Sequence, residues 1–234
     1  MFHQFQHEII TEQNVITFRS QGFLVFPKFL SDKGLREVET ALEQEIALRK
    51  KSLIPETSAA EIDGEIKVLA FLDKESNFFF DFGREAIFRD ISEQLMGQKT
   101  VPLFVEYFNK PPKTGSSSPL HQDQAFYRFL NAEAISFWIA IDDTTESNGC
   151  LHYATELPRK LLRHRMSSAI GFAQELDVEA YLERMVPVEL SAGGCVIHHS
   201  LAIHLSGENP SGRSRRAVVV NYKTVEFPNI QSLA

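Results

Sequence analysis

Cysteine is scarce in this chain, and its scarcity excludes several classes of protein. The 234 residues contain only Cys150 and Cys195, whereas disulfide scaffolds, zinc ribbons and iron–sulfur proteins need larger cysteine sets. Free cysteine is commonly buried as a small apolar residue, so we expect both side chains in the interior. Histidine and carboxylate groups are then the metal ligands that this sequence offers.

Basic charge and long apolar segments are also lacking. Lys and Arg total 24 against 31 Asp and Glu, a net charge of −7, which argues against nucleic-acid binding because such proteins usually carry a basic surface. No apolar run approaches the roughly 20 residues that span a bilayer, and the first residues lack a signal-peptide pattern. We expect a cytoplasmic protein without nucleic-acid or membrane partners.

Phenylalanine, in contrast, is abundant, with 19 in the chain. Each ring buries a large apolar area, so the protein has a large aromatic interior or a cavity lined with rings. The length suits one domain over residues 1–234, and a chain of this size can bury a core without disulfides.

The first part of the chain is predicted to mix helices and strands, with most of the helical bracing in 10–100. An apolar run at 22–26 and a strand at 65–71 are expected, together with a helix at 85–96. Ser31 is an N-cap candidate for another helix. Four apolar residues at helical spacing follow it: Leu35, Val38, Leu42 and Ile46.

From residue 101 the pattern changes to short β-type runs between turn-forming clusters. The expected strands are 101–108, 134–141, 150–154, 186–190, 194–198 and 216–226. Many short strands with turn signals between them are typical of a sandwich or barrel. We therefore predict a mainly β fold with flanking helices, a jelly roll whose core occupies about 101–226.

The segment His121-Gln122-Asp123 is a candidate metal motif. Residues i and i+2 of an extended strand project to the same face, so an imidazole and a carboxylate can point at one ion. A second imidazole from a neighbouring strand would complete two histidines and one carboxylate, the set that suits non-haem Fe(II). His198, His199 and His204 all compete for this role, and local pattern does not choose among them.

Arginines precede the last apolar strand, at Arg213, Arg215 and Arg216. A dicarboxylate that binds a metal through one end needs a fixed cation at its other end. Arginine supplies that partner better than lysine, because its planar fork binds a carboxylate through two hydrogen bonds. The same cluster is also compatible with a solvated loop.

The order and spacing of these pieces resemble the phytanoyl-CoA dioxygenase (PhyH-like) family of Fe(II)- and 2-oxoglutarate-dependent oxygenases. The resemblance covers about residues 64–224. It depends on four motifs: Asn109-Lys110-Pro111-Pro112 with Gly115, Pro119-Leu120-His121-Gln122-Asp123, Trp138 with Ser147-Asn148-Gly149-Cys150-Leu151, and His199, His204, Ser206, Gly207 and Asn209 followed by Arg215-Arg216-Ala217.

The resemblance implies a cupin-like double-stranded β-helix that uses Fe(II), 2-oxoglutarate and O2. It implies hydroxylation of an unactivated C–H bond of a small-molecule substrate, with release of succinate and CO2. His121, Asp123 and His204 are the implied iron ligands. Asp123 favours hydroxylation, since halogenating relatives replace this carboxylate with a small residue. No catalytic group beyond the metal ligands is implied.

The resemblance also implies the cosubstrate site. Arg215 corresponds to the arginine that binds the far carboxylate of 2-oxoglutarate, with Arg213 as the alternative that the cluster leaves open. Ser206 is expected to support it, and Trp138 and Lys67 are expected to border the cosubstrate.

Substrate contacts are less defined. Phe104, Tyr107, Phe126 and Tyr127 are candidates, although ordinary core packing is the favoured interpretation for each of them. A basic cluster at 159–165 could meet an anionic acyl-thioester or form a solvated face; a natural-product intermediate is the other substrate class considered. The sequence indicates no oligomeric state.

Two departures from the family pattern leave the substrate open. Thr155-Glu156-Leu157-Pro158 lies where many members have Pro-Gly-Ser-His, and Gly193-Gly194 lies where many have Gly-Asp.

Two other functions compete with this interpretation. One is a cupin-like sensor or scaffold that binds metal and 2-oxoglutarate without turnover, which would keep the same residues. The other is a metal-dependent enzyme without 2-oxoglutarate, which Arg215 with Ser206 argues against, because only a dicarboxylate cosubstrate needs that partner.

Overall fold

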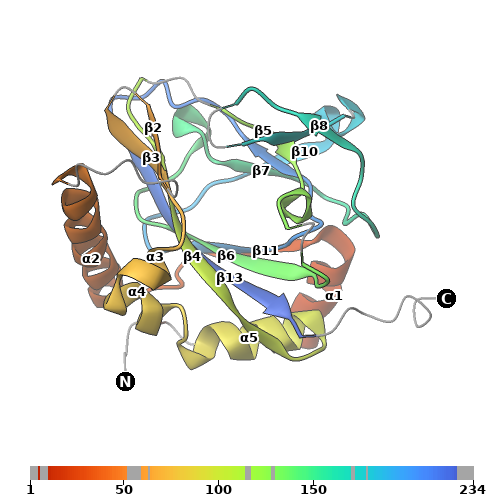
Figure 1. Ribbon diagram of the computed structural model, residues 1–234. Helices are drawn as coiled ribbons and strands as arrows, with labels where there is room; N and C mark the ends of the chain where they lie inside the picture. The colour runs from red at the N-terminus through yellow and green to blue at the C-terminus, as the bar shows by residue number, and fades with distance from the viewer. Residues whose placement is uncertain are drawn as a thin grey trace.

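The computed structural model describes residues 5, 10–51, 59–62, 64–113, 117–127, 130–169, 172–177 and 179–225. Two antiparallel sheets face each other, and helices lie along the outer side of the larger sheet (Figure 1). The mainly β jelly roll with flanking helices that the sequence predicts is confirmed.

The described α-helices all come from the first hundred residues: α1 (Glu12–Gln21), α2 (Asp32–Lys51), α3 (Leu72–Glu75), α4 (Asn77–Phe82) and α5 (Ala86–Met96). The predicted cap of α2 is present, since the Ser31 hydroxyl accepts a hydrogen bond from the Gly34 amide at 3.1 Å. The sequence pattern missed α1, because Phe18 is its one buried residue and its apolar periodicity is weak. None of the described helices is long and apolar enough to cross a membrane.

The larger sheet has the strand order β1-β11-β6-β13-β4-β3-β2. Its central strands match the predicted runs, and β1 and β3 match the apolar run and the strand predicted at 22–26 and 65–71; β2 was not predicted. The bounds in chain order are β1 (Phe23–Phe26), β2 (Ala59–Ile62), β3 (Glu65–Leu69), β4 (Thr100–Lys110), β6 (Ala134–Ala140), β11 (Cys195–His199) and β13 (Arg215–Thr224).

The smaller sheet has the order β10-β7-β12-β5, and a separate pair joins β8 to β9. Several of these strands have three or four residues, too few for a periodic pattern, which explains why β5, β8, β9 and β12 were not predicted as strands of their own. The bounds are β5 (Ser118–His121), β7 (Leu151–Ala154), β8 (His164–Met166), β9 (Gln174–Leu176), β10 (Met185–Val188) and β12 (His204–Ser206).

Strand alternation gives the larger sheet two different faces. On β13, Val218 and Val220 pack toward the helices in the main core, whereas Val219 and Asn221 line a cavity on the other side. Aromatic rings fill the helix side, where Phe88 lies 5.0 Å from Phe137 between ring centroids. Much of the phenylalanine is therefore structural. Cys150 and Cys195 are free and buried, as predicted.

Candidate active site

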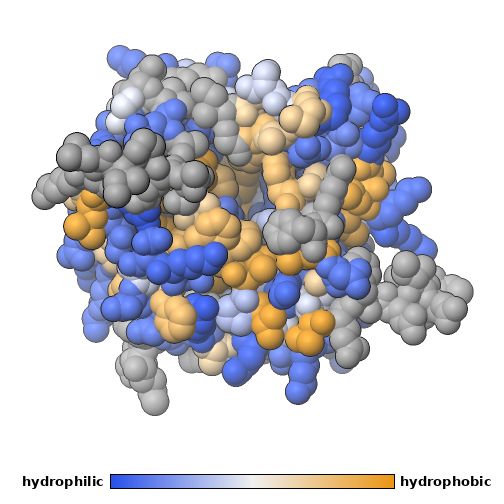
Figure 2. Space-filling model, viewed as in Figure 1, coloured by the Kyte–Doolittle hydropathy of each residue, from blue (hydrophilic) through white to orange (hydrophobic). Residues whose placement is uncertain are grey.

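A cavity lies between the two sheets and collects the side chains that the sequence singles out. Residues of β4, β6 and β13 line it from the larger sheet, and residues of β5, β7 and β12 line it from the smaller one. Figure 2 shows a hollow near the middle of the visible face, with hydrophobic residues around it.

His121 and His204 are paired across two strands of the smaller sheet. His121 ends β5, His204 begins β12, and the two are direct partners in the antiparallel register. Each Nδ1 lies against a backbone carbonyl, Pro119 O at 2.6 Å and Ala202 O at 3.1 Å. This contact assigns the proton to Nδ1, so each Nε2 lone pair is available to a metal ion.

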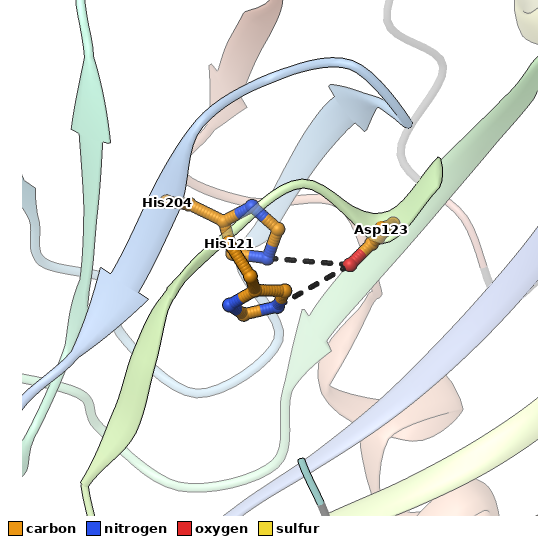
Figure 3. Close-up of side chains that lie close together, drawn as sticks. All are labelled: His121, Asp123 and His204. Carbon is orange, nitrogen blue, oxygen red and sulfur yellow. Dashed lines mark ion pairs between the residues drawn. The ribbon is translucent and has the colours of Figure 1, made fainter. Parts of the chain in front are cut away.

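Asp123 completes the group from the 3-10 turn Asp123–Ala125, just after β5. Gln122 keeps extended angles (φ −118°, ψ 131°), so Asp123 projects to the same side as His121 although the strand has ended. Asp123 Oδ1 lies 3.5 Å from Nε2 of both His121 and His204 (Figure 3). The three ligand atoms lie within 4.8 Å of one another and can hold one ion.

Electrostatics favour the metal-binding form of these ligands. Burial, reinforced by His121, lowers the pKa of His204 well below its usual range. Burial alone would raise the pKa of Asp123, but the surrounding imidazoles, His204 first, and the hydrogen bond that His198 donates to Oδ2 hold that pKa well below its ordinary value. At neutral pH the group therefore offers a neutral imidazole and an ionised carboxylate, as metal binding requires.

The structure separates the three histidines that the local pattern could not. His199 is turned away from the cavity, where its Nδ1 accepts the Leu201 amide at 3.0 Å and its Nε2 lies 3.5 Å from Glu133. His198 lines the cavity, but its Nε2 lies 2.9 Å from Oδ2 of Asp123, the oxygen remote from the other two imidazoles. His198 thus holds the carboxylate and leaves His204 as the partner of His121.

Arg215 and Ser206 form the other end of the cavity with Trp138. The Arg215 guanidinium lies 5.2 Å from the Trp138 ring centroid. Arg215 Nε and Ser206 Oγ are buried, and within the described residues neither has a hydrogen-bond partner. Burial lowers the pKa of Arg215 to about 10, which leaves it charged at neutral pH. A ligand carboxylate at this end would satisfy both orphaned groups.

Two lysines lie near Arg215. Lys67 of β3 is 5.7 Å from the Phe172 ring centroid, and burial, followed by Arg215, lowers its pKa to about 8. Lys110 is the cross-strand partner of Arg215 and donates to Gly207 O at 2.6 Å. Burial, then Arg215 and Lys67, lower the pKa of Lys110 to about 6. Lys110 belongs to the motif Asn109-Lys110-Pro111-Pro112, but the motif alone does not indicate that Lys110 lies beside Arg215.

Some predicted contacts reach the cavity and others do not. Phe126 and Tyr127 line it, and Phe126 lies 5.6 Å from the His121 ring centroid. Phe104 is not among its lining residues and packs on Tyr127. Tyr107 lies in the main core. It is three residues after Phe104 on β4, and residues an odd number apart on a strand face opposite sides of the sheet. Arg213 is exposed and lines a separate surface groove.

The basic segment 159–165 is largely exposed and partly neutralised by acidic neighbours. Arg165 Nε lies 2.7 Å from Glu175, and Arg163 Nε lies 3.8 Å from Asp177. The buried Gln122 side chain ties this segment to the metal motif, because its Oε1 accepts the Leu162 amide at 2.8 Å. These contacts support a solvated, structural role for the cluster.

Glu106 is a site residue that sequence reasoning missed. It lies on β4 and lines the cavity together with Asn221, whose Nδ2 donates to Glu106 Oε2 at 3.3 Å. Burial and then the nearby Asp123 charge raise the pKa of Glu106 to about 8. The alternation of side chains along β4 predicts that Glu106 and Tyr107 face opposite sides of the sheet. It does not predict which of the two sides faces the cavity.

Glu106 should make the stability of the metal-free protein depend on pH. Its pKa rises from 4.5 in the unfolded chain to about 8 in the folded one, so stability is full below pH 4.5 and is lost as pH approaches 8. Glu106→Gln removes this titration. Relative to the wild type, the free energy of unfolding of the variant should increase by about 2–4 kcal/mol between pH 5 and pH 8. This range uses about 1.4 kcal/mol per pKa unit and is reduced because solvent in the cavity screens the charge. Urea unfolding of both chains with a chelator measures this, and an equal difference at the two pH values would contradict it.

Two antiparallel sheets with two imidazoles and a carboxylate between them, and a buried arginine beyond, define a non-haem iron oxygenase. The family model for phytanoyl-CoA dioxygenase (PhyH) matches residues 18–217. The chain therefore belongs to the PhyH family of Fe(II)- and 2-oxoglutarate-dependent oxygenases. It is a dioxygenase with Fe(II) and 2-oxoglutarate as cofactors, and its substrate is a small molecule.

Individual relatives support the assignment. A phytanoyl-CoA dioxygenase of Arabidopsis thaliana is 25% identical over 89% of this chain and 87% of its own length. A 2-aminoethylphosphonate dioxygenase of an uncultured bacterium is 29% identical over 91% of this chain and 81% of its own. The crystal structure of EvdO2 from Micromonospora carbonacea var. aurantiaca with 2-oxoglutarate has the same fold, with a TM-score of 0.75, 20% identity and 94% of each chain covered.

Proposed function

We propose that this enzyme hydroxylates an unactivated C–H bond of its substrate, with His121, Asp123 and His204 as iron ligands. The observation that carries the proposal is the convergence of these three side chains, with ligand atoms within 4.8 Å, in a cavity that continues to Arg215. When bound, Fe(II) and 2-oxoglutarate supply the oxidising chemistry. Asp123 occupies the position of the carboxylate ligand, which favours hydroxylation over halogenation.

We assign the far carboxylate of 2-oxoglutarate to Arg215 and Ser206, with Trp138 and Lys67 beside it. The orphaned Arg215 Nε and Ser206 Oγ support this assignment, because a buried polar group without a partner is costly. Lys67 adds positive charge at the same end, whereas Lys110, with its pKa lowered to about 6, is mostly uncharged at neutral pH. The orphaned Arg215 Nε and Ser206 Oγ also argue against a metal enzyme that works without the dicarboxylate.

The remaining residues orient the ligands and exclude water. Phe126 and Phe172 lie 5.6 and 5.1 Å from the His121 ring centroid. Apolar walls beside the metal position keep bulk water from the reacting centre and so limit side reactions. Some of the abundant phenylalanine therefore lines the cavity, although more of it packs in the core.

Succinate formation from 2-oxoglutarate with Fe(II), ascorbate and O2 tests the proposal. We expect slow turnover without substrate, its loss on chelation, and stimulation by a substrate that gains one oxygen atom. If the protein binds Fe(II) and 2-oxoglutarate but forms no succinate in any of these assays, it is a sensor and not an enzyme. A substrate that gains a halogen or both atoms of O2 would overturn the hydroxylation proposal.

His198 should control how tightly the protein holds Fe(II). It donates to Asp123 Oδ2, and Tyr153 OH lies 2.9 Å from its other ring nitrogen. His198→Phe removes the donor and should weaken Fe(II) binding about 10–100-fold, the usual cost of losing an outer-shell partner. His198→Gln can still donate and should recover part of the loss. Chelator competition measures both, with His152→Phe as the control; wild-type affinity in His198→Phe would contradict the assignment.

A further inference from the structure

Glu106 is an acidic group in the cavity that the proposed function does not use. Within the described residues it is the one acidic side chain of the cavity lining besides Asp123. Its position is set by the sheet, since Glu106 is the cross-strand partner of Val219, which in turn pairs with Trp138. It is only half-buried, because its carboxyl faces the cavity.

A hydrogen-bond network orients this carboxyl and connects it to the metal group. The Asn221 amide oxygen accepts from Ser136 Oγ at 2.7 Å and from Tyr127 OH at 3.5 Å, so its amide nitrogen is directed to Glu106. Ser136 Oγ also lies 3.3 Å from Asp123 Oδ2. Asn221 donates to Oε2 of Glu106, and within the described residues no hydrogen bond to Oε1 is present.

No residue in the described ranges supplies a counter-charge for Glu106. Among the described residues it forms no ion pair, and the charges that act on it most are the like charges of Asp123 and Asp73. The buried basic groups Lys67, Lys110 and Arg215 act on one another at the other end of the cavity. The cavity is thus polarised, with cations at the 2-oxoglutarate end and an unpaired acid beside the metal position. Burying a carboxyl without a cationic partner is costly, so a ligand that brings one gains affinity there.

The neighbouring walls fit the same ligand chemistry. Phe126 and Tyr127 line the cavity with Glu106, and Tyr127 is linked to Glu106 through Asn221. Aromatic faces attract an ammonium group and also pack on the alkyl chain attached to it. A carboxylate or phosphate in this position would instead meet the like charges of Glu106 and Asp123.

We infer that Glu106 binds an ammonium group of the prime substrate, and that the enzyme hydroxylates the alkyl chain of a small aliphatic amine at a carbon that does not bear the nitrogen. The inference depends on the proposed function, because it places the C–H bond between Glu106 and the iron ligands. Asn221 and Tyr127 act through Glu106 by holding it in place. An ammonium ion favours the ionised carboxylate, so binding makes a charge-assisted hydrogen bond.

Three probes of one shape test the inference: n-pentylammonium, 1-pentanol and valerate. Each is titrated without O2 into the protein loaded with Fe(II) and 2-oxoglutarate, and the visible charge-transfer band reports binding at the metal. We expect pentylammonium to bind at least tenfold more tightly than pentanol, about the effect of one charged hydrogen bond, and valerate to bind least. Equal affinity for pentylammonium and pentanol, or a preference for valerate, would overturn the inference.

Glu106→Gln keeps the shape and removes the charge, so it should abolish the preference for pentylammonium. Glu106→Asp should recover part of it, and Glu156→Gln, which changes an exposed glutamate, should keep it in full. A preference that persists in Glu106→Gln would assign the ammonium site to other residues.

The same band separates this inference from two other failures. The dissociation constant of 2-oxoglutarate should differ less than about threefold between wild type and Glu106→Gln; a tenfold or larger loss with unchanged amine preference would place Glu106 in the cosubstrate site. If instead the iron-ligand variants keep full succinate formation, the proposed function itself is wrong, whatever the probes show.

Discussion

Asp123→Ala is expected to abolish Fe(II)-dependent conversion of 2-oxoglutarate to succinate while the chain stays folded. Asp123 is the one carboxylate in the ligand group, and its Oδ1 faces both imidazoles at 3.5 Å. Loss of an outer-shell partner already costs 10–100-fold, so loss of a ligand should leave less than about 1% of the rate. Succinate assays with circular dichroism measure turnover and folding together. Asp81→Ala, at an exposed aspartate, is the matched control.

The histidines give a second test of the same site. His204→Ala should match Asp123→Ala, whereas His199→Ala should retain turnover, because His199 contacts Glu133 and the Leu201 amide outside the cavity. Full turnover in both Asp123→Ala and His204→Ala would show that iron binds elsewhere. Loss in folded His199→Ala with retention in His204→Ala would exchange their roles.

Arg215→Ala should raise the apparent KM for 2-oxoglutarate about 10–100-fold, with a smaller effect on kcat at saturation. A charged, two-pronged hydrogen bond to a carboxylate contributes about 1.5–3 kcal/mol, which corresponds to that range. Arg215 is the buried arginine of the cavity, and its Nε has no partner among the described residues. Steady-state succinate formation against 2-oxoglutarate concentration measures the change.

Arg213→Ala is the control for this prediction. Arg213 is two residues away in sequence but exposed and outside the cavity, so its replacement should leave the 2-oxoglutarate requirement unchanged. If Arg213→Ala raises the 2-oxoglutarate requirement and Arg215→Ala does not, Arg213 rather than Arg215 binds the far carboxylate. Arg215→Lys should recover only part of the affinity, since lysine lacks the planar fork.

The two ends of the cavity have different chemistry, which bears on how the enzyme discriminates. At one end, the charges of Lys67 and Arg215 disfavour each other until a dianion binds beside them. Glu106 and Asp123 repel one another at the other end. In our proposal, charge directs the carboxylate-bearing cosubstrate and the inferred amine substrate to opposite ends, which keeps each from occupying the other's site.

The local sequence determined much of what is periodic or adjacent. The central strands followed from short apolar runs between turns, and the helices at 32–51 and 86–96 followed from their apolar spacing. His121 and Asp123 were identifiable because two residues of one extended segment share a side regardless of the rest of the fold. Arg215 and Ser206 needed the family resemblance as well.

Only the tertiary structure decided between residues that are alike in sequence. His204, rather than His198 or His199, meets His121 because β12 pairs with β5 in one register, a contact across more than eighty residues. Glu106 faces the cavity and Tyr107 the core because helices cover one side of the larger sheet. Local pattern states that alternate residues share a face; long-range packing decides which face becomes the core and which becomes the site.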